Sequence, residues 1–236
     1  MKAKHIAAAT LIVAPIVAQA NDLPVSISVD VPFYSKYVWR GINLVNDPVL
    51  QPSVTLGYEN WSLNLWGNYD IDNAKRFNEY DVTLNYSRAF GQGTWNLGYI
   101  DYAFPGVNPG HTRELYGRVD FNQEFSPYFA INFDVDEADG FYARIGGSTD
   151  FSTAAGDINF HGWFGYGSDK HNNFYYGNNK GGLADFGVEA TWSRSLSENT
   201  TGYVKLGYTA LLDKNHLNGA SNRNNFIFGF GVNFGL

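Results

Sequence analysis

The segment Asn225-Phe-Ile-Phe-Gly-Phe-Gly-Val-Asn-Phe-Gly-Leu236 decides the fold that this sequence predicts. Every second residue from Phe226 to Leu236 is apolar, and the residues between them are small or polar except for Ile227. Successive side chains of a β-strand point to opposite faces, so this period of two predicts a strand with one apolar face. A helix would instead repeat its apolar residues every three or four positions.

The same alternation recurs upstream and divides the chain into twelve candidate strands. They cover residues 25–40, 49–59, 61–70, 79–90, 94–103, 113–124, 127–136, 140–151, 157–167, 184–194, 201–212 and 224–236. A soluble β-sandwich or lipocalin-like barrel would also show one apolar face. The connections, however, alternate between short turns and longer polar loops, as they do in outer-membrane barrels. We therefore predict an all-β fold, a closed antiparallel transmembrane β-barrel of about twelve strands, or ten if one weak pair fails.

Residues 1–20 have the organisation of a secretory signal peptide. A basic start (Lys2 and Lys4) precedes an apolar stretch of twelve residues and the small-residue site Ala18-Gln19-Ala20. Such a stretch is too short for a membrane-spanning helix, which needs about 20 residues. We therefore expect cleavage and a single mature barrel domain over residues 21–236 in a bacterial outer membrane. Its expected partners are the export and barrel-assembly machinery, outer-membrane lipid and lipopolysaccharide.

Charge and composition argue against several classes of function. The chain has 16 Lys and Arg against 23 Asp and Glu, and a net charge of −7 does not suit a nucleic-acid partner. It has no cysteine, which excludes disulfides and zinc–thiolate sites. The acidic run Asp134–Gly140 has Ala138 where a calcium loop needs a ligand. We therefore expect neither a metal site nor a cofactor.

In a membrane barrel the apolar face of each strand meets lipid, so the polar residues between line the lumen. The residues predicted to line or constrict the pore are Lys36, Arg40, Asp81, Arg118, Asp120, Asp134, Arg144, His161, Glu189 and Lys205. Two interpretations of this lumen stay open. Its mixed charges neutralise one another and fill the interior, or they form a selective path for a small polar solute.

Aromatic residues near strand ends are predicted to form girdles at the membrane interfaces. The residues assigned to these girdles are Tyr37, Trp39, Trp61, Trp95 and Trp192. In the first predicted strand, Tyr37 and Trp39 would anchor the outer interface while Lys36 and Arg40 point into the mouth.

The stretch Ser35-Lys-Tyr-Val-Trp-Arg-Gly-Ile42 carries a family resemblance. Together with Pro48-Val-Leu-Gln-Pro-Ser53 it resembles the opening of the TorF-like porins, a family of bacterial outer-membrane proteins of uncharacterised function. The resemblance is strongest over residues 26–70 and looser over the rest of the chain. It implies an outer-membrane location and a barrel fold, and it supplies neither a substrate nor catalytic residues.

Three functions are consistent with the sequence, and each makes a different prediction about the lumen. The favoured function is a narrow channel for passive passage of small hydrophilic solutes, with a wet lumen whose charges are partly unpaired. A non-conducting structural or surface-interaction barrel would instead be closed by ion pairs and rings, and would act through the extracellular loops at 168–183 and 213–223. A membrane-embedded hydrolase, the least favoured, would place His161 or a loop histidine beside a Ser or Asp. The chain has no Gly-x-Ser-x-Gly motif, and we do not expect an enzyme.

Overall fold

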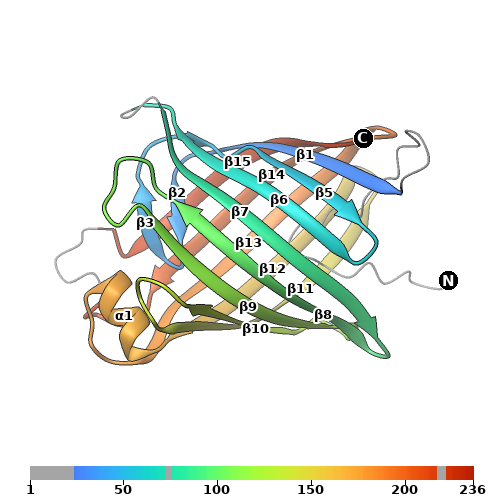
Figure 1. Cartoon of the computed structure of the whole chain (residues 1–236). Coiled ribbons are helices and arrows are strands. Elements are labelled where there is room, and N and C mark those ends of the chain that lie inside the picture. The colour runs from blue at the N-terminus through green and yellow to red at the C-terminus, as the bar shows by residue number, and fades with distance from the viewer. Residues whose placement is uncertain (1–23, 73–75, 217–221) are drawn as a thin grey trace.

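The computed structural model describes residues 24–72, 76–216 and 222–236, and it is a closed antiparallel barrel (Figure 1). Twelve strands form the wall, because the short β4 and β5 pair with the same two neighbours and together make one interrupted wall strand. The wall strands are β1 (Val25–Tyr34), β4 (Val49–Leu50), β5 (Ser53–Tyr58), β6 (Trp61–Asp70), β7 (Arg76–Phe90), β8 (Gly93–Ala103), β9 (His111–Phe121), β10 (Tyr128–Asp134), β11 (Phe141–Thr153), β12 (Gly156–Gly167), β13 (Gly182–Ser197), β14 (Thr200–Leu211) and β15 (Asn224–Gly235). This confirms the predicted fold class and strand number. The proposed signal peptide lies outside the described residues.

The first and last wall strands close the barrel. β1 pairs antiparallel with β15 in a continuous register from Ser28 opposite Gly235 to Tyr34 opposite Gly229. The rings of Phe33 and Phe230 stack across this seam, with their centroids 5.1 Å apart. Every wall strand therefore has a partner on both sides, which removes the open sheet edges that a bilayer does not tolerate.

The two faces of the wall differ in polarity as the alternation predicts. Large apolar side chains lie exposed on the outside; those of β12 to β15 include Phe160, Phe164, Val188, Leu206, Phe228 and Phe230. The inside holds buried polar groups such as Asn68, Glu114 and Asp185, each with no exposed surface. An apolar exterior around a polar interior is the arrangement of a barrel that faces lipid. Among the described residues, no helix is long and apolar enough to cross a membrane.

The predicted first strand, residues 25–40, is wrong beyond Tyr34. The chain leaves the wall there and forms a hairpin of β2 (Tyr37–Trp39) and β3 (Ile42–Val45), which pair only with each other. The turn between them is Arg40-Gly41, and both residues have positive φ, 47° and 78°. Two successive left-handed residues form the tight turn that matches the twist of a hairpin. The alternation of the predicted strand continues through Arg40, so the sequence pattern did not reveal this turn.

Gly41 is required at the tip of this hairpin for a second reason. A Cβ atom there would come within 2.7 Å of the Leu211 side chain and 2.9 Å of Cβ of Asp185. The hairpin thus touches the wall strands β13 and β14 from the inside. Figure 1 shows the hairpin within one end of the barrel.

The long connection after β12 contains a short helix that the sequence did not predict. Helix α1 (Asp169–Tyr176) begins at Ser168, whose side chain accepts a hydrogen bond from the backbone N–H of His171. It ends at Gly177, a left-handed residue of the kind that commonly terminates helices. Its eight residues are too few to be stable alone, so α1 depends on packing against the barrel.

Loop lengths distinguish the two ends of the barrel. The end that carries the described chain termini has short connections, whereas the hairpin and α1 lie at the opposite end (Figure 1). Several connections differ in length from those predicted, and two of them are longer than expected. The turn expected at Phe125-Ser126 spans residues 122–127, and the loop expected at 137–139 spans 135–140 because β10 ends at Asp134.

Neighbouring residues of β12 provide a test of which face meets lipid. Phe160 is 48% exposed on the outside, whereas Asn159 is on the lumen side, where it donates a hydrogen bond to Asp150. We expect Phe160→Arg to lower the free energy of unfolding by about 2–4 kcal/mol, because it places a charge in hydrocarbon. Asn159→Arg, one position away, should have a small effect because its charge lies in the lumen beside Asp150. Urea unfolding of the protein in lipid vesicles measures both, and equal effects would contradict the assignment of faces.

Candidate functional site

The outer mouth of the barrel is filled by the β2–β3 hairpin and by α1, which form a plug. The hydrophobic core cluster of the described protein lies here, between the plug and the inner face of the wall. Its buried residues are Ile42 from the hairpin, Tyr176 from α1, and Tyr142, Ala184 and Leu211 from the wall. The hydroxyl of Tyr176 also donates a hydrogen bond to the backbone carbonyl of Arg40, 2.9 Å away. The hairpin and the helix therefore pack on each other as well as on the barrel.

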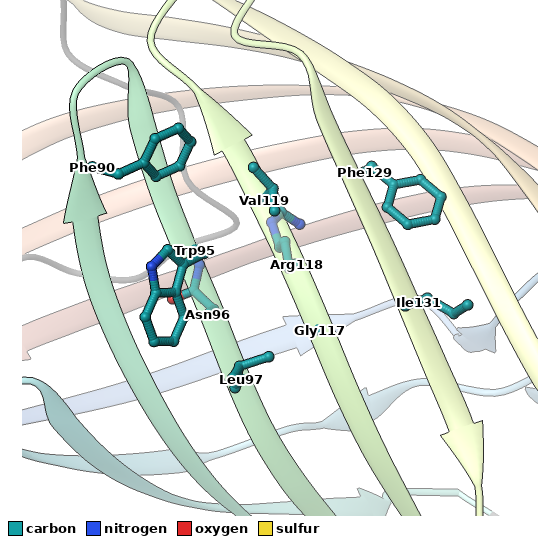
Figure 2. A pocket seen from close by; sticks show the side chains of 9 residues that line it. All are labelled: Phe90, Trp95, Asn96, Leu97, Gly117, Arg118, Val119, Phe129 and Ile131. Carbon is teal, nitrogen blue, oxygen red and sulfur yellow. The ribbon is translucent and has the colours of Figure 1, made fainter.

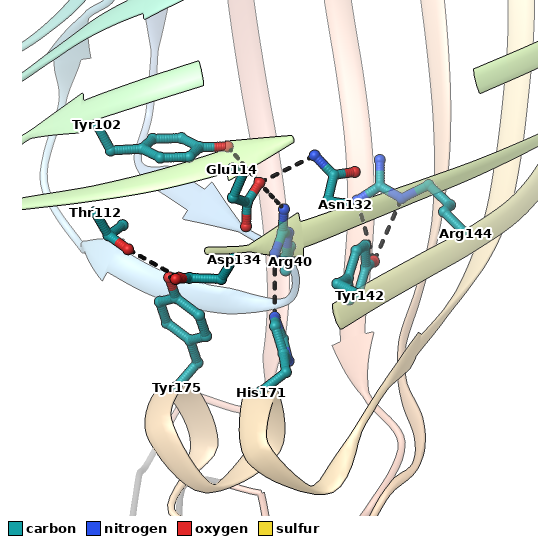
Figure 3. Close-up of polar contacts among 10 residues, drawn as sticks. All are labelled: Arg40, Tyr102, Thr112, Glu114, Asn132, Asp134, Tyr142, Arg144, His171 and Tyr175. Carbon is teal, nitrogen blue, oxygen red and sulfur yellow. Dashed lines mark hydrogen bonds and ion pairs between the residues drawn. The ribbon is translucent and has the colours of Figure 1, made fainter. Parts of the chain in front are cut away.

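Arg40 is the centre of the plug, as Figure 3 shows. Its Nη2 lies 2.7 Å from Oε2 of Glu114, and both side chains are almost fully buried. Its Nη1 lies 3.1 Å from Nε2 of His171. The guanidinium is also placed between two rings, 4.2 Å from the centroid of Trp39 and 4.4 Å from that of Tyr142. One side chain of the hairpin thus joins strand β9, strand β11 and helix α1.

Two carboxylates of the wall each accept hydrogen bonds from the plug and from neighbouring wall residues (Figure 3). Oε2 of Glu114 accepts hydrogen bonds from Arg40, from the hydroxyl of Tyr102 and from Asn132. Oδ2 of Asp134 accepts from Thr112 and from the hydroxyl of Tyr175 on α1, both at 2.8 Å. Asp134 was predicted to line the pore, and its role in the structure is to fix α1 at the mouth.

Electrostatics keep the plug in one protonation state at neutral pH. Burial by itself would lower the pKa of Arg40, but the Glu114 carboxylate outweighs it and holds the pKa above its usual value. Burial, followed by the charge of Arg40, lowers the pKa of His171 to about 3. His171 is therefore neutral. Its Nδ1 lies 3.2 Å from Oδ1 of Asn172, so Nδ1 carries the hydrogen and Nε2 accepts from Arg40.

The prediction that Tyr37 and Trp39 belong to the interfacial girdle is wrong. Tyr37 is 8% exposed and donates a hydrogen bond to Glu79 on the inner face of β7, 3.2 Å away. Trp39 packs edge-on against Tyr102 and Tyr175, also inside the mouth. The physical reason is the inward fold of the hairpin, which turns residues expected at the lipid surface toward the lumen. Lys36, before the hairpin, forms an exposed hydrogen bond with Asn46.

The three other predicted aromatics lie on the outer surface. Trp61 and Trp192 are 49% and 37% exposed, and Trp95 is the third residue of β8. All three lie toward the end with the short turns, where Trp61 and Trp95 both pack against Tyr86. Their proposed role at a membrane interface stays a prediction.

Below the plug, Arg144 projects from β11 and has no carboxylate partner. Its Nε and Nη2 donate to the hydroxyl of Tyr142 at 3.3 and 3.2 Å, and the guanidinium lies 4.8 Å from the ring centroid of Trp163. The neighbouring Asp185 instead accepts hydrogen bonds from Tyr142 and from the indole N–H of Trp163. Among the described residues, no Asp or Glu oxygen lies within 4 Å of the Arg144 nitrogens.

The other predicted cations of the lumen are paired. Arg118 forms a two-point contact with Asp120 at 2.6 to 2.9 Å and lies over the ring of Tyr128. Lys205 lies 3.5 Å from Oε2 of Glu189, and Nδ1 of His161 lies 3.8 Å from the same oxygen. The residues predicted to line or constrict the pore are therefore separated. Arg40 belongs to the plug, Asp134 holds α1 from the wall strand β10, and Arg118 pairs with Asp120 near the other end of β9.

Asp81 is the predicted pore residue whose negative charge has the fewest compensating contacts. Its Oδ1 is buried and has no hydrogen-bond partner among the described residues, and no Lys or Arg of that set lies within 4 Å. Glu79, two residues earlier on the same inner face of β7, accepts a hydrogen bond from Tyr37. The β7 side of the lumen is therefore acidic, whereas β11 carries the cation Arg144.

A groove of about 560 Å³ lies on the outside of the wall and is shown in Figure 2. Gly117 leaves a dent there between outward-facing apolar side chains of β8, β9 and β10; those lining it include Trp95, Leu97, Val119, Phe129 and Ile131. The groove is on the face assigned to lipid, so it is separate from the lumen.

The arrangement of the described histidines does not favour a hydrolytic site or a metal site. Nε2 of His161 lies 3.1 Å from the hydroxyl of Tyr128, and its Nδ1 faces Glu189, so neither ring nitrogen is directed at a serine. His171 contacts Arg40 and Asn172. Within residues 24–72, 76–216 and 222–236, no group of three or more His, Asp or Glu could hold a metal ion.

Sequence reasoning placed most of these side chains on the inner face but missed the roles of two. Glu114 lies on the face of β9 that the alternation assigns to the lumen. Nothing in the sequence, however, indicates that it anchors a distant loop. His171 was assigned only to a long polar loop, because neither a motif nor a period marks α1. No signal in the sequence joins Arg40 to residues 74 and 131 positions away.

Comparison with known proteins supports the barrel and gives a partial family match. Residues 18–132 match the model of a family described as a bacterial protein of unknown function (Gcw_chp). No curated protein matches the chain. The structure is similar to the NanC porin, with 15% sequence identity and a TM-score of 0.56 over 88% of this chain and 98% of that chain. It is similar to the KdgM porin with 13% identity and a TM-score of 0.56, over 88% of this chain and 98% of that chain. It is also similar to the KdgM porin in complex with disordered oligogalacturonate, with 12% identity and a TM-score of 0.54 over 89% of this chain and 98% of that chain. At these identities the likeness shows the fold, which is that of porins.

The neutral His171 makes the plug sensitive to acid. Since its pKa is about 3 in the folded protein and about 6.5 unfolded, its contribution to docking is complete above pH 6.5. That contribution falls, by on the order of 1 kcal/mol per pH unit, as the pH drops from 6.5 toward 3. A proton on Nε2 of His171 would face the donor Nη1 of Arg40. The nearby negative charge of Asp134 offsets only part of this repulsion. The rings of Tyr142, Tyr175 and Tyr176, which pack on His171, are neutral over this range.

We expect hydrogen exchange of the α1 amides to accelerate between pH 7 and pH 5, after correction for the intrinsic exchange rate. His171→Gln should abolish most of this pH dependence, whereas the exposed His111→Gln should retain it. Exchange that is equally protected at both pH values in the unaltered protein would contradict the expected coupling.

Proposed function

We propose that this protein is an outer-membrane channel for passive passage of small hydrophilic solutes, narrowed at its outer mouth by the inward-folded hairpin and α1. The observation that carries this proposal is the incomplete pairing of charge below the plug. Asp81 has an unpartnered oxygen and Arg144 has no carboxylate within 4 Å among the described residues. Leaving such groups in a dry interior would cost several kcal/mol each, and water in the lumen would relieve that cost.

The similarity to porin structures supports the same proposal. NanC and KdgM are porins, and this chain spans 88% of its own length and 98% of theirs in the comparison. The match to the Gcw_chp model over residues 18–132 is consistent with a member of the TorF-like porins, which the first segment resembles. We further propose cleavage after residue 20, insertion by the barrel-assembly machinery, and contact of the apolar exterior with outer-membrane lipid and lipopolysaccharide.

The hairpin favours one competing function, a barrel that does not conduct. Its contacts reach Glu79 on β7, Glu114 on β9, Leu211 on β14 and Asn225 on β15, so they extend around the inside of the mouth. A barrel whose plug never moves would act through its surface. The two functions differ in whether release of the plug opens a conducting path.

Arg40 provides the variant that separates these functions. Arg40→Gln leaves Glu114 buried without its counter-charge, which typically costs about 3–5 kcal/mol and should release the hairpin from the wall. For a channel we expect discrete conductance steps from refolded residues 21–236 in a planar bilayer. We expect larger or longer openings for Arg40→Gln, because less of the lumen is obstructed.

Two further variants control this experiment. Arg40→Gln combined with Glu114→Gln removes both buried charges and should return the conductance part of the way to its original value. Arg113→Gln removes an exposed arginine that pairs with Asp136 on the outer rim, and its conductance should match that of the unaltered protein. A folded barrel that stays silent both with Arg40 and with Arg40→Gln would contradict the channel and support the non-conducting barrel.

A further inference from the structure

Arg144 differs from the other cations of the lumen in how its charge is balanced. Arg118 contacts Asp120 through two nitrogens, Lys205 contacts Glu189, and the buried Arg40 contacts Glu114. The Arg144 guanidinium makes its described hydrogen bonds only to neutral hydroxyls, those of Tyr142 and Tyr128. Among the described residues, no carboxylate oxygen lies within 4 Å of its nitrogens.

The surroundings of Arg144 orient the guanidinium without forming a direct ion pair with it. Asp185, which has no exposed surface, would be its natural counter-ion. Both oxygens of Asp185 are already occupied, at 2.7 Å by the hydroxyl of Tyr142 and at 3.0 Å by the indole N–H of Trp163. The same two side chains hold Arg144, one by hydrogen bonds and the other by its ring face. A network that fixes a cation through neutral groups is the kind of arrangement from which a preorganised anion site is built.

A column of rings continues from Trp163 along the wall. Its ring lies 5.0 Å from that of His161 at an interplanar angle of 26°, and His161 lies 5.7 Å from Tyr128 at 28°. Gly187 lets the indole lie close to the backbone of β13, since a Cβ atom there would come within 2.2 Å of the ring. The rings are therefore held along the inner face of the wall.

We propose that Arg144, together with the ring column Trp163–His161–Tyr128, is a binding subsite for a small solute that carries a carboxylate group. The inference names the solute class of the proposed channel and rests on the hydrated lumen of that function. The planar guanidinium presents parallel N–H groups that match the two oxygens of a carboxylate, and a neutral solute of the same size lacks this charge-assisted contact. The ring column offers an apolar surface to the remainder of the solute.

Binding is measured on the folded barrel in detergent, so that it does not depend on conductance. The probes are sodium glucuronate and glucose, which share a hexose ring and differ in the carboxylate. We expect saturable binding of glucuronate by isothermal titration calorimetry at constant ionic strength, and none of glucose at the same concentrations. Arg144→Gln should weaken glucuronate binding by about 10- to 100-fold, the usual effect of one charge-assisted hydrogen bond or two.

Two variants separate loss of the site from loss of the fold. Arg144→Lys keeps the charge but lacks the planar fork, and should bind with an affinity between those of Arg144 and Arg144→Gln. Arg113→Gln, on the outer rim, should bind like the unaltered protein. The fold of each variant is checked by its circular dichroism and its heat-dependent mobility in gels.

The possible outcomes distinguish this inference from the proposed function. Glucuronate binding that is lost in Arg144→Gln and kept in Arg113→Gln supports the subsite, even in a barrel that does not conduct. Absence of binding, equal binding of glucose, or equal binding by Arg144→Gln would overturn the subsite, including in a barrel that conducts. A silent barrel that binds glucuronate would overturn the channel alone.

Discussion

Backbone pairing between β1 and β15 is the constraint on which the rest of the structure depends. A membrane offers no water to unpaired backbone groups, so a sheet can cross it only if its first and last strands meet. The continuous register from Ser28 to Tyr34 meets this requirement. Closure also creates an interior, and the alternation that puts phenylalanines on the outside necessarily fills that interior with polar side chains.

Each charged side chain inside the barrel is either buried with partners or left without an ionic partner. At the outer mouth Arg40 and Glu114 are both dry, and they are tolerated because each has several partners in good geometry. Farther in, Asp81 and Arg144 have no ionic partner within 4 Å in the described chain. The first arrangement is typical of a packed core and the second of a wet surface. The same barrel thus combines a packed mouth with charges farther in that lack an ionic partner.

The proposed selectivity of the lumen rests on the pairing of Asp185. Its two oxygens are occupied by neutral donors, so its negative charge orients Arg144 through Tyr142 and Trp163 and does not contact it. Under the proposed subsite, Arg144 keeps its affinity for an incoming anion, whereas Arg118 and Lys205 are paired directly with Asp120 and Glu189.

The sequence by itself determined the fold class, the number of wall strands and the face of nearly every wall residue, because a period of two is a local property of the chain. It assigned Arg144, Asp81 and Glu189 to the lumen for the same reason. Only the tertiary structure decided that residues 35–48 leave the wall, because an Arg-Gly turn can continue the alternation of a strand. It also decided which charges are paired, since Arg40, Glu114 and His171 are distant in sequence and meet only after the barrel has closed.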